Sequence, residues 1–335
     1  MTRDAPEPRQ SWARRVLVAL GGNAMSAPDG SATEADQIAA LGVAAVHIAD
    51  LVAAGVQVAV THGNGPQVGN LLVKNELSAH VVPPVSLDWC VASTQATIGF
   101  VLSDALETEF AARGLDRRVA ALITRTLVDA DDPAFAAPSK PVGRYLAAEQ
   151  ARGFFGLGQY WHDFGERGWR RVVASPKPIQ ILDAAVASSL VDAGTVVICS
   201  GGGGIPVIRT ADGSLTGVEA VIDKDLSAAI LADLLGCDAL VIATDIDSAV
   251  LNYGTSEARP LGLVSTRQMA AHISAGHFAA GSMGPKVEAA QRFASGVSNP
   301  GREAAHRTSV ITRLDRLADA LIEEPGAVGT VIRQQ

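Results

Sequence analysis

The sequence is poor in cysteine and in aromatic residues. Its three cysteines, Cys90, Cys199 and Cys237, lie far apart among apolar neighbours, so neither a disulfide framework nor a metal-binding cysteine spacing is present. Aromatic residues make up 4% of the chain and charged residues 19%, whereas hydrophobic residues reach 48%. This composition excludes a disordered chain and predicts a large apolar core with reduced thiols inside it.

The chain also lacks a surplus of positive charge and a long apolar run. Its formal net charge is −8, which argues against a general nucleic-acid binder, because phosphate backbones require many lysines and arginines. The apolar run Val16–Leu20 ends at Gly21 and is too short for an export signal, and the apolar stretch 41–60 is interrupted by polar residues. We therefore expect a cytoplasmic protein without a membrane span.

Short apolar runs alternate with helical patterns along the chain. Runs without polar alternation are typical of strands buried on both faces of a parallel sheet; they occur at Val16–Leu20, Val56–Val60, Val119–Ile123, Thr195–Cys199, Ala239–Ala243 and Ser309–Thr312. Helices are expected at 38–54, 67–78, 93–113, 183–193, 225–235, 286–295 and 314–322. This alternation predicts an α/β fold, a three-layer α/β/α sandwich with a mostly parallel central sheet.

One region interrupts this pattern. Residues 126–175 hold three prolines and eight of the fifteen aromatic residues. Such a cluster in an aromatic-poor chain predicts a small projecting lobe with a core of its own, inserted in the sandwich, although a long irregular loop would have the same composition. Residues 1–14 are polar with two prolines and are expected to be a flexible tail, leaving 15–335 as one domain.

Three glycine-rich turns each follow a predicted strand: Gly21-Gly22-Asn23, the segment 62–66 with Gly63 and Asn64, and the segment 200–204 with Gly201 and Gly202. In a parallel sheet they fall at the carboxyl ends of the strands, where backbone N–H groups can approach an anion closely. No G-x-x-x-x-G-K-[ST] motif occurs, and Pro206 interrupts a G-x-G-x-x-G pattern. The turns therefore predict a polyanion site that is neither a P-loop nor a dinucleotide fingerprint.

Two lysines are expected at helix starts. Asp225 is a plausible N-cap of helix 225–235, which puts Lys224 at its positive end, and Pro285 suits the first position of the next helix, which puts Lys286 in its first turn. A lysine there opposes the helix dipole unless an anion is bound nearby, so the pair indicates a phosphate site. The alternative for Lys224 is local compensation by Asp223 and Asp225, and the alternative for Lys286 is an ordinary exposed lysine.

Other candidate residues carry less weight by themselves. Lys140 lies between two prolines in the aromatic-rich region and could be a third cation or an ordinary loop lysine. His62 adjoins a glycine turn, but packing or backbone hydrogen bonding is the favoured role, and the histidines show no metal-ligand pattern. Phosphoryl transfer suits this inventory, because it requires positioning and charge neutralisation, by lysines and Mg²⁺, more than a nucleophilic side chain.

The sequence resembles carbamate kinases of the amino acid kinase superfamily from about Val16 to Ile332. The segments that carry the resemblance are Val18–Ala24, Thr61–Val68, Asp132–Phe135, Ser139–Gly143, Ser175–Pro178, Gly217–Asp225 and Gly281–Glu288. The resemblance implies reversible phosphoryl transfer between ATP and carbamate, giving ADP and carbamoyl phosphate. It also implies Mg-ATP as the nucleotide substrate and a homodimer.

The resemblance also implies roles for individual residues. Lys224 and Lys286 would contact the transferring phosphoryl group, Asp223 would orient them, and Lys140 would reach in from the lobe. The carbamate and phosphate cradle would consist of Gly21, Gly22, Asn23, Gly63 and Asn64. The nucleotide would lie against Gly201, Gly202, Ala243, Thr244, Asp245 and Tyr253. A kinase for another small acid, or a nucleotide sensor without catalysis, remains the alternative.

Overall fold

The core of the protein is an eight-stranded sheet. The computed structural model describes residues 11–25, 33–155, 158–279, 282–296 and 307–334. The strand order is β15-β17-β16-β12-β1-β2-β9-β3, with six strands parallel and with β15 and β17 at one edge running opposite to them. The strands are β1 (Arg15–Leu20), β2 (Gln57–His62), β3 (Val119–Ala121), β9 (Val196–Ile198), β12 (Ala239–Thr244), β15 (Leu263–Ser265), β16 (Thr308–Arg313) and β17 (Thr330–Arg333).

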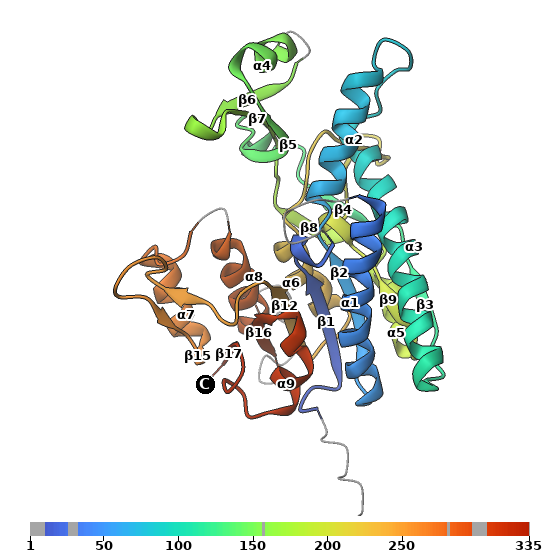
Figure 1. Ribbon diagram of the computed structural model, residues 1–335, viewed down its shortest axis with the longest axis vertical. Helices are drawn as coiled ribbons and strands as arrows, with labels where there is room; N and C mark the ends of the chain where they lie inside the picture. The colour runs from blue at the N-terminus through green and yellow to red at the C-terminus, as the bar shows by residue number, and fades with distance from the viewer. Residues whose placement is uncertain (1–10, 26–32, 156–157, 280–281, 297–306, 335) are drawn as a thin grey trace, which may run out of the picture.

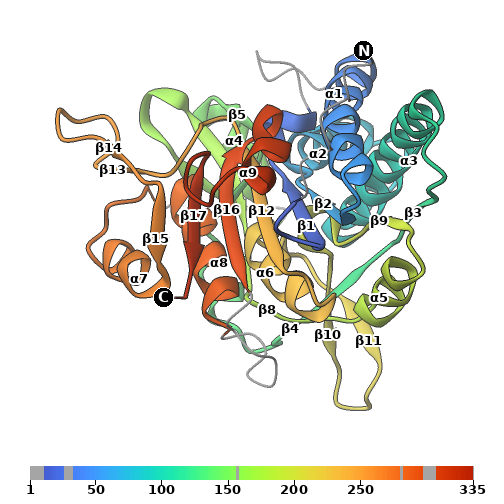
Figure 2. The same ribbon diagram turned by 90° about the horizontal axis from the view of Figure 1, so that it is seen from below.

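Helices cover both faces of this sheet, as Figures 1 and 2 show. Successive side chains of β1 point to opposite faces, so Val16 and Val18 enter one apolar cluster and Leu17 enters the other. The first cluster is closed by α1 (Glu34–Ala53), α3 (Leu87–Arg113) and α9 (Leu317–Ile322), and the second by α5 (Ala184–Asp192), α6 (Lys224–Leu234) and α8 (Met283–Ser295). The predicted three-layer sandwich is confirmed.

Helix α1 is long and apolar enough to cross a membrane by length and composition. In the structure it is a core helix: Leu41, Ile48 and Val52 are buried in the first apolar cluster. A capping box of Thr33 and Asp36 starts it, because each residue's side chain accepts a hydrogen bond from the other's backbone.

A small lobe stands out from the sandwich at the top of Figure 1. It consists of a three-stranded sheet, β5 (Lys140–Leu146), β7 (Trp169–Val173) and β6 (Tyr160–Asp163), together with α4 (Ala148–Phe155). Its aromatic residues pack on one another: Phe154 stacks on Trp161 at 5.5 Å between ring centroids, and Tyr145 meets Phe164 edge-on at 5.8 Å. These contacts give the lobe a partly exposed aromatic cluster of its own.

A four-stranded sheet links the lobe to the body. Its order is β11-β10-β4-β8, from β4 (Arg125–Val128), β8 (Pro178–Ile181), β10 (Ile205–Arg209) and β11 (Leu215–Gly217). The two ends of the segment 126–175 therefore belong to this linking sheet and its loops, and 140–173 forms the lobe proper. Helix α2 (Gly65–Ser78) follows β2 and contacts β5 of the lobe.

Several features were missed or misplaced from the sequence. The strands of the linking sheet, the lobe elements, the edge strands β15 and β17, α7 (Thr266–Ser274) and the small ribbon β13 (Val250–Leu251) with β14 (Arg259–Pro260) were not assigned as elements. Residues 1–10 lie outside the described residues. The rest of the expected tail includes residues fixed to the body: the Trp12 indole donates to the Ala320 carbonyl, and Ala13 is buried.

Candidate active site

Four neighbouring strands end at one edge of the sheet, and three of them carry the predicted glycine-rich turns. β12, β1, β2 and β9 are adjacent and parallel, so the loops after them meet above the same edge. The Gly21 N–H donates to the Ala243 carbonyl at 3.1 Å, and a side chain at Gly21 would clash with that oxygen. Gly63 lies beside Gly22 and the Lys224 side chain. Asn23 lies in a short 3-10 turn, Gly22–Met25, and its side chain is outside the described residues.

The turn after β9 packs too closely for any residue but glycine. A Cβ on Gly201 would lie 2.4 Å from the His62 ring, and one on Gly202 would lie 2.1 Å from the Asn64 amide nitrogen. Gly202 also has φ of +65°, a conformation that side chains disfavour. These two glycines, assigned from the sequence to the nucleotide phosphates, thus lie against His62 at the end of β2 and Asn64 just after it.

Helix α3 holds this turn in place. The Gln95 side chain donates to the Gly201 carbonyl at 3.0 Å and accepts from the Thr124 N–H at 2.8 Å, and the Asn64 amide donates to the Thr94 hydroxyl at 2.9 Å. The three side chains involved, Gln95, Asn64 and Thr94, are buried. A network of this kind fixes the backbone of the turn.

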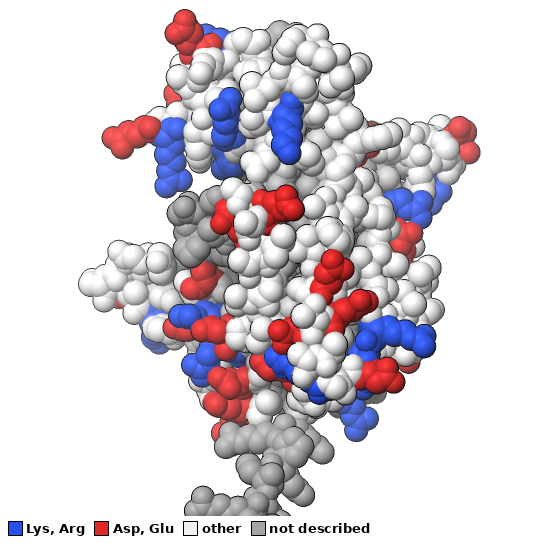
Figure 3. All heavy atoms as spheres, turned by 45° about the vertical axis from the view of Figure 1, so that its right-hand side comes forward, with Lys and Arg blue, Asp and Glu red and all other residues white. Residues whose placement is uncertain are grey.

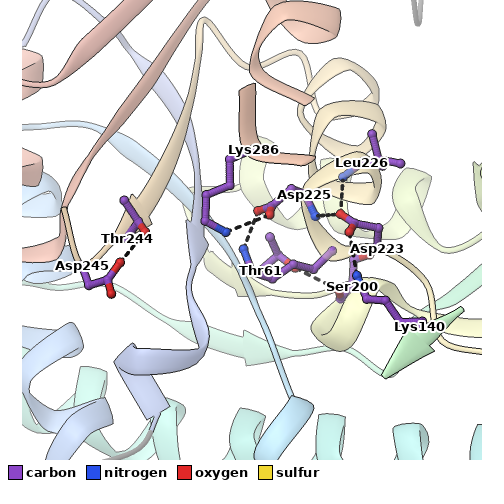
Figure 4. A network of polar contacts seen from close by, with 10 residues as sticks. Thr61, Lys140, Ser200, Asp223, Asp225, Leu226, Thr244, Asp245 and Lys286 are labelled. Carbon is purple, nitrogen blue, oxygen red and sulfur yellow. Dashed lines mark hydrogen bonds and ion pairs between the residues drawn. The ribbon is translucent and has the colours of Figure 1, made fainter. Parts of the chain in front are cut away.

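The two helix-start lysines meet at one carboxylate. Lys224 Nζ lies 2.5 Å from Asp225 Oδ1, and Lys286 Nζ lies 3.1 Å from Asp225 Oδ2. Figure 4 shows Lys286 and Asp225 pointing toward one another from α8 and α6. The side chain of Asp225 is 5% exposed, that of Lys224 14% and that of Lys286 17%. Two cations therefore share one anion in a largely buried place.

The charges of this cluster affect its ionisation. Burial opposes ionisation of Asp225, but the two ammonium groups outweigh burial and hold the pKa of this carboxyl below its usual value. Burial lowers the pKa of Lys224, as does Lys286, while Asp225 opposes the shift. The trio has an excess of one positive charge, which an anionic ligand would neutralise.

Asp223, rather than Asp225, is the N-cap of α6, so that sequence prediction was wrong. Asp223 Oδ1 accepts hydrogen bonds from the N–H groups of Asp225 at 3.0 Å and Leu226 at 3.3 Å. The Asp225 carboxylate, freed from capping, is the direct partner of Lys224 and Lys286. Either aspartate fits the cap position by its local sequence, so the sequence alone does not distinguish the two.

Lys140 reaches the same place from the lobe. It opens β5, and its Nζ lies 2.9 Å from Asp223 Oδ2, so the lobe lysine and the body carboxylate form an ion pair (Figure 4). The side chain of Lys140 is 39% exposed and that of Asp223 15%. The structure thus brings together Lys140, Lys224 and Lys286 around two adjacent aspartates.

Lys286 differs in detail from its predicted setting. Helix α8 begins at Met283, so Pro285 is its third residue and not its first, and Lys286 is the fourth. Gly281 lies outside the described residues. The lysine is also partly buried and paired, which excludes the alternative of an ordinary exposed lysine.

His62 has the packing role that was favoured for it. Its ring is buried against the glycine turn, and Nδ1 lies 2.7 Å from the Gly63 carbonyl, to which it donates. Burial lowers the pKa of His62 to about 4, although this hydrogen bond opposes the shift, and Lys224 lowers the pKa further. A neutral imidazole beside Lys224 avoids adding a second cation to the cradle.

A cavity of about 450 Å³ adjoins the lysine cluster. Its walls include Gly21, Gly22 and Lys286 together with Ala243, Thr244, Asp245 and Tyr253. The Tyr253 side chain is 76% exposed at the wall. The segment predicted to bind the nucleotide therefore shares one cavity with the first glycine turn and Lys286, as expected for a ligand that carries its phosphates toward the lysines.

The described residues hold no group of three or more His, Cys, Asp or Glu side chains that could bind a metal. Asp245 is the one carboxylate among the described residues that line the cavity, and it is exposed. Mg²⁺ is commonly bound by one or two carboxylates together with substrate phosphates and water. The donor set fits a metal that arrives with a nucleotide, and it does not form a resident metal cage.

The chain is similar to known proteins over nearly its whole length. A family model described as "Amino acid kinase family" matches residues 14–299. Carbamate kinase 1 of Enterococcus faecium is 41% identical over 95% of this chain and 99% of its own, and carbamate kinase of Pyrococcus horikoshii is 40% identical over 95% and 98%.

Solved structures give the same result. Carbamate kinase from Giardia lamblia bound to AMP-PNP superposes with a TM-score of 0.87 and 38% identity, and the match covers 97% of this chain and 100% of that one. UMP kinase from Bacillus anthracis, at 14% identity and a TM-score of 0.50, shares the fold alone.

Proposed function

The chain belongs to the carbamate kinases of the amino acid kinase family, and from this premise we propose that it transfers a phosphoryl group reversibly between ATP and carbamate. A carbamate oxygen attacks the γ-phosphorus of ATP, the bond from that phosphorus to the β–γ bridging oxygen breaks, and ADP and carbamoyl phosphate result. The observation that carries the proposal is the meeting of three lysines and two glycine-rich turns beside one cavity.

The lysines have distinct tasks in this proposal. Lys224 and Lys286 neutralise charge on the phosphoryl group as it moves, because their ammonium groups are held by Asp225 before any ligand arrives. Lys140 adds a third cation from the lobe. No covalent protein intermediate is required, since phosphoryl transfer depends mainly on positioning and charge.

The first two turns would form the cradle of the acceptor. Gly22 and Gly63 lie side by side next to the Lys224 side chain, and without side chains of their own they leave room for a small planar anion beside this lysine. The Gly63 N–H itself donates to the Leu20 carbonyl at 3.1 Å. We assign Asn23 and Asn64 to the same cradle. Asn64 already uses its amide to hold Thr94, which fixes the orientation of its carbonyl oxygen.

The nucleotide would occupy the cavity with its phosphates toward Gly21 and Lys286 and its base toward Tyr253. Mg²⁺ bound to the phosphates would neutralise part of their charge, with Asp245 as the carboxylate on the wall. The positive charge of the lobe would attract an anionic nucleotide. Residues 140–173 hold six Lys or Arg against three Asp or Glu, a surplus of three positive charges in a chain with a net charge of −8. Figure 3 shows basic side chains gathered on the lobe end beside a few acidic ones, and side chains of both signs mixed over the body below.

We also propose a homodimer and a cytoplasmic location. Helices α1 and α3 expose apolar side chains, with Ile38 50% and Phe100 60% exposed beside a groove of about 800 Å³ between the helices. A second copy of the chain would cover this face. Sedimentation of the wild type and of Phe100→Glu tests the proposal, which requires a dimer for the first and a shift to monomer for the second.

The decisive experiment measures ATP formation from ADP and carbamoyl phosphate. A second assay, in the opposite direction, supplies ATP with N-acetylglutamate, aspartate or glutamate in turn as the acceptor. The proposal requires turnover with carbamoyl phosphate and none with the three amino acids. Turnover with one of the amino acids would make the protein a kinase for another small acid. Binding of ATP without any turnover would instead favour a nucleotide sensor.

A further inference from the structure

One carboxylate connects the lobe to the body. The two oxygens of Asp223 have different partners: Oδ1 accepts from the first N–H groups of α6, and Oδ2 accepts from Lys140 Nζ at 2.9 Å (Figure 4). The carboxylate therefore fixes the start of the helix that carries Lys224 and, on its other side, the ammonium group that comes from the lobe. No other ion pair between β5 and α6 or its N-cap occurs in the described part of the chain.

We propose that Asp223 is the positioning residue of Lys140, so that a single side chain sets the lobe lysine relative to the helix-bound lysine. The inference rests on the proposed function, because it gives Lys140 a phosphoryl ligand to meet. It differs from the sequence-based assignment, in which Asp223 orients Lys224 and Lys286, since Asp225 is the direct partner of those two.

The burial of the pair supports positioning. Asp223 has a side chain only 15% exposed and is fixed by its helix-capping bonds, whereas Lys140 is 39% exposed on a long flexible stem. The rigid partner therefore determines where the mobile one lies. An ammonium group has three donors, so Lys140 can keep its bond to Asp223 and still donate to a phosphoryl oxygen.

A second contact places the same strand. Gly69 on α2 faces Gly143 on β5 so closely that a Cβ on Gly69 would lie 3.2 Å from Gly143 Cα. Gly143 has φ of +68°, and the β5–β7 register shifts between Val142 and Tyr145. The backbone of the lobe thus rests directly on α2, three residues from Lys140, and any added side chain would move β5 away from the body.

The first experiment is a double-mutant cycle on kcat with Asp223→Asn and Lys140→Met. Asparagine caps helices about as well as aspartate, so Asp223→Asn keeps the start of α6 and removes the charge that holds Lys140. We expect Lys140→Met to lower kcat by about tenfold or more. In the double variant, kcat should be less than about twofold below that of Lys140→Met alone. Fully additive losses would overturn the inference, because Asp223 would then act independently of Lys140.

The second experiment moves the lobe without touching either residue of the pair. Gly69→Ala should lower kcat several-fold in the wild type and have little effect when Lys140 is already Met. Gly153→Ala is the matched control, because Gly153 is an exposed residue of α4 in the lobe and a Cβ there meets nothing within 4 Å. An equal effect of the two alanine variants would contradict the role of the glycine contact.

A third measurement separates this inference from the proposed function. Amide hydrogen exchange of residues 140–146 needs no turnover, and Asp223→Asn and Lys140→Met should each speed it without changing exchange in α6. If the wild type makes no ATP from carbamoyl phosphate but exchange responds in this way, the proposed function fails and the positioning contact stands. Unchanged exchange in both variants overturns the contact, whatever the activity.

Discussion

The body and the lobe each bring positive charge to the same site, but they hold it differently. In the body, Lys224 and Lys286 share the buried carboxylate of Asp225, and both helices are packed on the central sheet. In the lobe, Lys140 forms one half-exposed pair with Asp223 at the end of a strand outside the sandwich. The body cations are thus fixed when the core folds, whereas the lobe cation depends on where the lobe lies.

The strongest test of this difference removes the carboxylate that the body lysines share. Asp225→Asn leaves two largely buried ammonium groups without their counter-ion, so we expect a loss of about 3 to 5 kcal/mol in unfolding free energy and a loss of more than about a thousandfold in kcat. Urea unfolding and the ADP plus carbamoyl phosphate assay measure the two effects. Asp116→Asn, on an exposed residue at the opposite edge of the sheet, should change neither.

Removing one body lysine should separate activity from stability. Lys286→Ala leaves Lys224 paired with Asp225 and ends the repulsion between the two lysines, so unfolding free energy should change by less than about 1 kcal/mol. The same change should lower kcat by about a hundredfold to a thousandfold, as expected for one preorganised cation at the transferring group. Equal losses in melting and in kinetics would show that Lys286 is structural.

The buried histidine of the body makes stability depend on pH. The pKa of His62 falls from 6.5 to about 4 in the folded state, so the unfolded chain takes up the proton first as the pH decreases. This contribution is present above about pH 6.5 and is lost as the pH falls toward 4. A pKa difference of one unit corresponds to about 1.4 kcal/mol, so the free energy of unfolding should fall by about 2 kcal/mol between pH 7 and pH 5.

Two readouts check the histidine prediction. The His62 ring signals in an NMR titration should shift with a midpoint near 4, not near 6.5. His62→Gln should flatten the dependence of unfolding free energy on pH between 7 and 5, whereas the exposed His80→Gln should not. A normal titration of His62 would mean that its ring is solvated in solution.

The lobe lysine should affect activity alone, and less than the body lysines do. Its pair is partly solvated, so Lys140→Met should change unfolding free energy by less than about 1 kcal/mol. Turnover should fall by about tenfold to a hundredfold, because the body lysines remain in place. A loss as large as that of Lys286→Ala would remove the distinction between fixed and lobe-dependent cations.

The sequence predicted the body better than the lobe for a physical reason. Strands buried on both faces appear as uninterrupted apolar runs, and the six predicted runs are β1, β2, β3, β9, β12 and β16 of the structure. The lobe and linking strands are partly exposed, and several contain a proline or aromatic and charged residues, so they carry no such signal. Their pairing depends on residues distant in sequence.

The site shows the same division. The glycine turns and lysines could be located from the sequence, because strand ends and helix starts have local signatures. The choice between Asp223 and Asp225 as the helix cap could not be predicted, because both residues fit the local pattern. Contacts between distant parts of the chain distinguish them: Lys140 pairs with Asp223, and Lys286 pairs with Asp225. The role of Gln95 as a support of the glycine turn was likewise invisible, since Thr124 is distant in sequence.

The smallest expected effect is at Tyr253, which belongs to neither group of cations. Tyr253 is 76% exposed on the cavity wall, so Tyr253→Ala should leave unfolding free energy unchanged. Loss of a stacking surface for the base should raise KM for ADP about threefold to tenfold with kcat unaltered, while Tyr253→Phe should keep the wild-type KM. Tyr160→Ala, at an exposed tyrosine of the lobe, is the control. A fall in kcat with unchanged KM would mean that Tyr253 contributes to the transfer step, and the base would then have to bind elsewhere in the cavity.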